Sequence, residues 1–180
     1  MEKINVVVVG YGGMGRYHAN HIEEFENFNL VGIYDIKQEA CDVAVEKGVY
    51  VYPSFEAVLE DEKVELIVCA TYNDCHKDIA IRAMKAGKAV YVEKPMASNY
   101  EDCCRINRIA ETSGVPCFVA YYRRYLPLPY TYTCSSVIHS SRNMYYLFIY
   151  CNSSPPVYLP TISFWIIFKM PMIIFTHSFE

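Results

Sequence analysis

The chain has 180 residues, 53% of them hydrophobic, and a net charge of -4. This length accommodates one ordinary domain with a buried core, and the acidic balance lacks the basic field that a phosphate backbone requires, so we expect small-molecule partners and no nucleic acid. The eight cysteines form no C-x-x-C pair, and the first residues show no export signal, which together predict reduced thiols and a cytoplasmic protein.

Apolar runs and helical periods alternate along the first 126 residues. The predicted strands are short apolar runs rich in β-branched residues, and they cover 4–9, 30–35, 49–53, 64–71, 89–93 and 116–122. The predicted helices cover 13–25, 38–47 and 55–61, the last capped by Ser54, and two more begin at Asn73 or Asp74 and at the Ser98-x-x-Glu101 capping box. This order predicts an α/β fold, a doubly wound parallel sheet of the Rossmann type with strand order 3-2-1-4-5-6.

Residues 127–180 have a different composition. They hold three of the 36 charged residues and none of the eight glycines, so they lack the material for a solvated surface and for turns. We therefore predict a binding domain over 1–126 and, over 127–180, an apolar tail that is not a native domain but arises from intron read-through or a frameshift. A membrane anchor over 157–179 is the alternative, which Pro160, Lys169 and Pro171 disfavour.

The pattern G-x-G-x-x-G lies between the first predicted strand and the first predicted helix. Gly10 permits a tight turn, Gly12 lets the backbone approach a pyrophosphate, and Gly15 lets helix and strand pack closely. The unpaired N–H groups at the start of the helix then face the phosphates. The alternative is a turn that only packs a helix. The predicted dinucleotide-binding loop comprises Gly10, Tyr11, Gly12, Gly13, Met14 and Gly15.

Asp35 ends the second predicted strand, 20 positions after Gly15. A carboxylate at this place accepts hydrogen bonds from both hydroxyls of the adenine ribose. It also repels a 2'-phosphate, so we predict NAD rather than NADP as the cofactor. Lys37, two residues further on, weakens that preference. The alternative is an aspartate that only caps a helix.

Three further segments carry a resemblance to a known family. They are "ATYNDCH" (70–76), "AMKAGKAVYVEKP" (83–95) and "YYRRYLP" (121–127). Together with the glycine loop, they make the stretch from residue 4 to about 126 resemble the N-terminal domain of the Gfo/Idh/MocA oxidoreductases. The usual family form of the first segment is A-T-P-N-x-x-H, so Tyr72 stands in place of a proline, while Asn73 and His76 are retained.

The resemblance implies hydride transfer between a nicotinamide ring and a carbinol carbon, typically of a sugar or polyol. It also implies that Lys94, in the Glu93-Lys94-Pro95 triplet, is the catalytic residue beside the reacting hydroxyl. An ammonium group held there stabilises developing alkoxide charge and takes part in proton transfer. The further cofactor-binding residues that the resemblance implies are Thr71, Asn73, His76 and Glu93.

Two histidines share a face of the first predicted helix. His18 and His21 are three residues apart, but no third ligand accompanies them, so surface or packing roles are favoured and no metal is predicted.

The resemblance stops after Leu126. Family members carry a second, mixed α/β domain with a catalytic histidine preceded four residues earlier by an aspartate, whereas here Ser135 precedes His139 and Ile173 precedes His177. We therefore expect that domain to be missing. Two interpretations stay open, a truncated NAD(P)-dependent oxidoreductase and an NAD-binding module without catalysis, and the oligomeric state is open as well.

Overall fold

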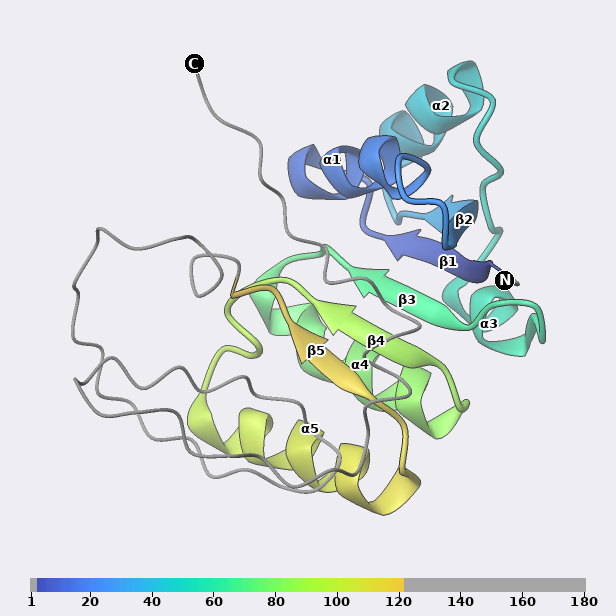
Figure 1. Cartoon of the computed structure of the whole chain (residues 1–180). Coiled ribbons are helices and arrows are strands. Elements are labelled where there is room, and N and C mark those ends of the chain that lie inside the picture. Colours follow the sequence, from blue (N-terminus) through green and yellow to red (C-terminus); the bar gives the residue numbers. More distant parts are fainter. Residues whose placement is uncertain (1–2, 122–180) are drawn as a thin grey trace, which may run out of the picture. The chain divides into compact units, whose positions relative to one another are not determined.

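One parallel sheet forms the centre of the described domain (Figure 1). The computed structural model describes residues 3–121, so the predictions for 122–180 lie outside the described residues. Within the described part, five strands pair in the order β2-β1-β3-β4-β5, all parallel. The strands are β1 (Ile4–Val9), β2 (Phe28–Tyr34), β3 (Leu66–Cys69), β4 (Ala89–Val92) and β5 (Cys117–Val119). Because the strands are parallel, all their carboxyl ends meet at the same edge of the sheet.

Helices cover both faces of this sheet, as the strand-helix alternation predicts. α1 contacts β1, β2 and β3 on one face, while α4 contacts β3 and β4 on the other and packs beside α5. The helices are α1 (Gly13–Ile22), α2 (Gln38–Glu46), α3 (Phe55–Glu60), α4 (Asn73–Lys85) and α5 (Tyr100–Ser113). The doubly wound α/β fold is confirmed.

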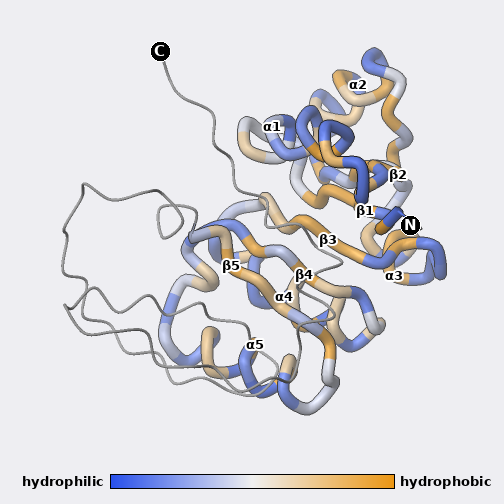
Figure 2. The backbone as a smooth tube through the Cα atoms, in the orientation of Figure 1, coloured by the Kyte–Doolittle hydropathy of each residue, from blue (hydrophilic) through white to orange (hydrophobic). Residues whose placement is uncertain are grey.

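The core follows from the alternation of side chains along each strand. Val7, Val9 and Ile67 point to the face that α4 and α5 cover, and they are at most 1% exposed. The intervening Val6 and Val8 point to the α1 face and are equally buried. Figure 2 shows the corresponding hydrophobic colour along β1 and β3. None of the helices between residues 3 and 121 is both long and apolar enough to span a bilayer.

The third predicted strand is the main difference from the expected sheet. Residues 49–53 form only an isolated parallel bridge, Val51 opposite Ile33 of β2, flanked by the hydrogen bonds Ile33 N to Tyr50 O and Tyr52 N to Ile33 O, each 2.8 Å. Pro53 follows at once, and a proline has no N–H to extend a ladder. The position of the bridge beside β2 still gives the predicted order 3-2-1-4-5-6.

Helix starts match the predicted caps in one of three cases. Ser54 caps α3, and its Oγ accepts from Ala57 N at 3.1 Å. The predicted Ser98 capping box is wrong by one residue, because Asn99 is the cap of α5 and accepts from Asp102 N at 2.9 Å. The cap predicted for α4 at Asn73 or Asp74 is also wrong, since Tyr72 occupies that position without a side-chain hydrogen bond.

Candidate functional site

The glycine loop joins β1 to α1 at the carboxyl edge of the sheet. Gly10 has a φ of +89°, and a Cβ on it would lie 2.7 Å from the carbonyl oxygen of Ala70. A Cβ on Gly15 would lie 1.7 Å from the carbonyl oxygen of Gly10, a distance no real contact allows. The turn and the close seating of α1 on it therefore both require the absence of a side chain.

The middle of the loop is open rather than packed. Gly12 and Gly13 are exposed, and a Cβ on either one would meet no atom within 4 Å. Gly12 is the residue before α1 and offers no side-chain cap. The first N–H groups of an α-helix have no partner inside the helix, so these donors are directed at the open space before the loop. The site fits the diphosphate of a dinucleotide, an anion that needs no basic side chain there.

Asp35 lies directly beside this loop. One carboxylate oxygen, Oδ2, accepts a hydrogen bond of 2.6 Å from Tyr11 N, and the other, Oδ1, accepts one of 2.8 Å from Lys37 N. These two main-chain donors orient the half-buried carboxylate. Each oxygen retains a second lone pair, so the group is still able to accept from the two hydroxyls of a ribose.

A contact between side chains links the loops after β2 and β3. Lys37 Nζ donates to Tyr72 Oη at 3.4 Å and lies 5.6 Å from the centre of that ring. Both residues are exposed. Tyr72, the departure from the family pattern, therefore contacts the side chain of Lys37, whose backbone N–H is bonded to Asp35.

Three of the predicted cofactor residues lie in the loop after β3 and the first turn of α4, in different environments. Thr71 is half-buried and Asn73, the first residue of α4, is exposed, so both border open space. His76 is completely buried. Its Nδ1 lies 2.8 Å from Pro95 O and its Nε2 lies 3.2 Å from Thr71 O. His76 thus lies beneath the loop and ties it to the loop after β4, rather than facing solvent.

Glu93 and Lys94 follow β4 and differ in exposure. Lys94 is exposed, whereas Glu93 is 8% exposed and accepts a hydrogen bond of 3.1 Å from Lys94 N at Oε2. The other oxygen of Glu93, Oε1, lies 2.7 Å from His18 Nε2. Burial raises the pKa of Glu93, but the hydrogen bond and charge of His18, together with Lys94, outweigh it and leave this pKa below its ordinary value.

His18 is the site residue that the sequence analysis did not assign. It lies on the inner face of α1, and the buried residues on that face are Gly15, His18, Ala19 and Ile22. That spacing was visible in the sequence and marks His18 as an inward residue, but nothing in it indicates Glu93, 75 positions away. The neighbouring His21 has another partner, since its Nδ1 lies 2.7 Å from Tyr17 O. Over residues 3–121, no three potential ligands gather as a metal site.

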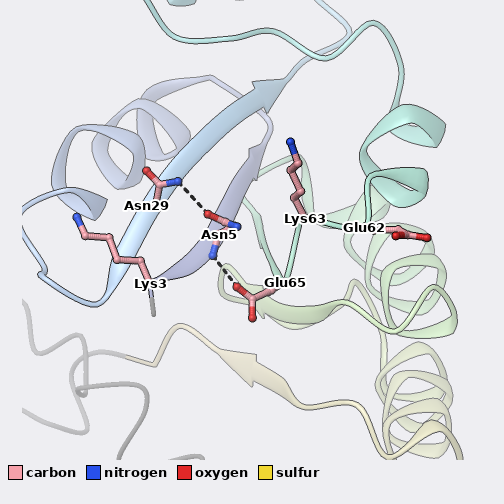
Figure 3. Close-up of a pocket in the computed structure, with 6 residues that line it drawn as sticks. All are labelled: Lys3, Asn5, Asn29, Glu62, Lys63 and Glu65. Atoms are coloured by element: carbon pink, nitrogen blue, oxygen red, sulfur yellow. Dashed lines mark hydrogen bonds between the residues drawn. The ribbon is translucent and has the colours of Figure 1, made fainter. Parts of the chain in front are cut away.

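A polar hollow lies at the opposite edge, where the strands begin (Figure 3). Asn29 Nδ2 donates to Asn5 Oδ1 at 2.8 Å, and Glu65 Oε2 accepts from Asn5 N at 3.0 Å. Hydrogen bonds therefore link three of its six lining residues, Asn5, Asn29 and Glu65, and none of the predicted site residues lines it. The lining residues are Lys3, Asn5, Asn29, Glu62, Lys63 and Glu65.

Comparisons with known proteins agree with this geometry. Glucose-6-phosphate 3-dehydrogenase of Bacillus subtilis is 35% identical over 129 residues, which cover 70% of this chain and 35% of that enzyme. The scyllo-inositol 2-dehydrogenase (NAD(+)) of the same organism is 32% identical over 130 residues, covering 70% of this chain and 38% of the relative. A solved NAD-binding protein from Listeria innocua is 42% identical, with a TM-score of 0.67 over 69% of this chain and 36% of that one.

The match is confined to one region. The chain spans little more than a third of the length of these relatives. The family model described as "Oxidoreductase family, NAD-binding Rossmann fold" matches residues 4–121, which is most of the described structure. The chain therefore belongs to the Gfo/Idh/MocA oxidoreductase family, and the region with the glycine loop is its NAD-binding domain.

Proposed function

We propose that this protein binds NAD along the carboxyl edge of its sheet as the cofactor half of a sugar or polyol dehydrogenase. The observation that carries the proposal is the order of groups along that edge. Asp35 follows β2, the open helix start of α1 follows β1, and Lys94 follows β4. With the strand order β2-β1-β3-β4, these groups offer a ribose acceptor, a phosphate cradle and an ammonium group in sequence.

Each part of the site has its own task in this proposal. The amides of Gly13 and Met14 hold the diphosphate, and the Asp35 carboxylate holds the adenine ribose. The same carboxylate disfavours a 2'-phosphate, which supports NAD over NADP. Thr71 and Asn73 border the other half of the dinucleotide, because that half must extend from α1 toward β3 and β4.

Lys94 carries the proton chemistry in the proposal. The bound nicotinamide supplies the hydride acceptor or donor. The ammonium group of Lys94 is exposed at the end of β4, where it donates a hydrogen bond to the reacting hydroxyl and stabilises negative charge on that oxygen. The substrate, the cofactor and the ammonium group of Lys94 then lie together at the carboxyl edge of the sheet.

Titration with NADH, followed by its fluorescence, tests the binding step. We expect saturable binding that Asp35→Ala weakens strongly, and the absence of binding to the unaltered chain overturns the proposal. Turnover across a panel of sugars and polyols tests the chemistry, with Lys94→Ala as the variant that keeps NADH binding and loses turnover.

A second function, NAD binding without catalysis, is favoured by the length of the match. The chain spans little more than a third of the length of its relatives, and the family model that matches it over residues 4–121 is that of the NAD-binding fold. Saturable NADH binding with no turnover on any substrate selects this alternative.

The composition of residues 127–180 supports the proposal that they are not a native domain. Translating the other reading frames of the DNA after codon 126 tests it, because a frame that restores a charged, glycine-containing α/β sequence confirms a frameshift.

We also keep the proposal of a cytoplasmic protein, which the six free cysteines of the described part support.

A further inference from the structure

A buried pair of titratable side chains joins α1 to the end of β4. His18 is 5% exposed and Glu93 is 8% exposed, and Nε2 of the first lies 2.7 Å from Oε1 of the second. Removing two such groups from water is costly, and a well-packed apolar pair of similar volume is often at least as stable. The stability of the fold therefore gives no sufficient reason for this pair.

The Glu93 side of the pair leads to the proposed catalytic residue. One carboxylate oxygen is bonded to His18, and the other accepts from the backbone N–H of Lys94 at 3.1 Å. The backbone N–H of Glu93 donates to Cys69 O of β3 at 2.9 Å. Glu93 is thus fixed to the sheet at its backbone, and its side chain fixes the first residue of the Lys94 loop.

His18 lies close in sequence to the glycine loop that is proposed to bind the diphosphate. His18 lies one helical turn after Gly15 on the same inner face of α1. The ring of Tyr91, two residues before Glu93 and on the same face of β4, contacts the His18 ring edge to face with the centroids 5.7 Å apart. The histidine therefore contacts Tyr91 of β4 through its ring and Glu93, directly after β4, through Nε2.

We propose that His18 and Glu93 are positioning residues that set the Lys94 loop against the phosphate-binding helix, and thereby form the nicotinamide side of the site. This inference rests on the proposed function. The adenine half of the ligand lies toward Asp35 and β2, away from the pair. Loss of the pair is therefore expected to weaken the hold on the nicotinamide half and to leave the adenine half unaffected.

Two ligands that differ only at the nicotinamide end provide the test. NADH carries both halves, whereas ADP-ribose lacks the nicotinamide ring. We expect His18→Leu to weaken NADH binding about tenfold, the effect of one well-placed hydrogen bond, while ADP-ribose binding stays within about twofold. His18→Gln, which keeps an N–H donor, is expected to restore NADH binding to within about threefold.

The matched control is His21→Leu, which removes the same type of residue from the same helix. His21 faces Tyr17 O rather than Glu93, so both affinities are expected to stay unchanged. Equal weakening of NADH and ADP-ribose in His18→Leu, or no weakening of either, overturns the proposal.

Hydrogen exchange at the backbone N–H of Lys94 gives a second measurement that needs no ligand. Glu93→Leu removes both acceptor oxygens, so exchange at the Lys94 N–H is expected to accelerate while that of Val8 in β1 does not. Uniform acceleration, or none, overturns the proposal even where His18→Leu does not fold. If the unaltered chain binds neither ligand, the proposed function fails, and this measurement still tests the pair.

Discussion

The two edges of the parallel sheet are both polar, yet they are built differently. At the edge where the strands begin, Asn29 is bonded to Asn5 and Asn5 to Glu65 (Figure 3). At the edge where the strands end, α1 begins without a cap, and Gly12 and Gly13 leave its amides open. The comparison shows that a concave surface alone does not indicate where a ligand binds. The edge with the glycine loop differs from the other edge by main-chain N–H groups that have no partner within the helix.

The largest expected effect concerns how the binding edge is packed. In Gly15→Ala the new Cβ would lie 1.7 Å from Gly10 O, a main-chain atom that has no room to move without opening the turn. We expect the free energy of unfolding to fall by about 3 kcal/mol, measured by urea denaturation. Gly13→Ala is the control, since its Cβ meets no atom within 4 Å and stability is expected to stay the same or rise. Equal losses in the two variants contradict this account.

The next effect compares the two edges by their contribution to NAD affinity. Asp35→Ala removes a carboxylate that two main-chain N–H groups hold in place beside the loop. NAD affinity measured by calorimetry is expected to fall about 100-fold, as for the loss of charge-assisted hydrogen bonds to a ribose. Glu65→Ala removes a carboxylate from the other edge and should leave the affinity unchanged. A comparable loss in Glu65→Ala would erase the distinction between the edges.

A smaller effect tests whether the diphosphate of NAD lies against the glycine loop at Gly12. The Cβ of Gly12→Ala meets no protein atom within 4 Å, so the free energy of unfolding should stay within about 0.5 kcal/mol. The methyl group stands where the diphosphate approaches, and NAD affinity is expected to fall about tenfold. Unchanged affinity would show that the diphosphate lies elsewhere.

The smallest effect is a pH dependence of stability that originates at Glu93. The pKa of Glu93 lies below its ordinary 4.5, so its contribution to stability is present above that pH and is lost as the pH falls through the lowered pKa. Glu93→Gln should reduce stability by about 1 kcal/mol at pH 7, with the difference shrinking below pH 4.5. The exposed Glu65→Gln serves as the control. A difference that persists at pH 3 argues against the charged form of Glu93.

Local pattern was enough for most of the fold and for part of the site. β1 has the bounds that its apolar run predicts, and the sheet has the predicted order, because parallel strands joined by helices have few right-handed arrangements. The turn at Gly10 was predictable for a similar reason, since a positive φ and the space for α1 are requirements of the G-x-G-x-x-G segment itself. Errors arose where neighbouring candidates compete, as Ser98 and Asn99 did for the cap of α5.

Contacts between distant segments depended on the folded chain instead. That His18 meets Glu93, that His76 lies between two carbonyl groups, and that Asp35 accepts from Tyr11 N each result from which strand lies beside which and which side chain faces inward. Periodicity can place each residue on a face of its own helix or strand. It contains no distance between residues 75 positions apart, because that distance arises only when α1 packs across the sheet.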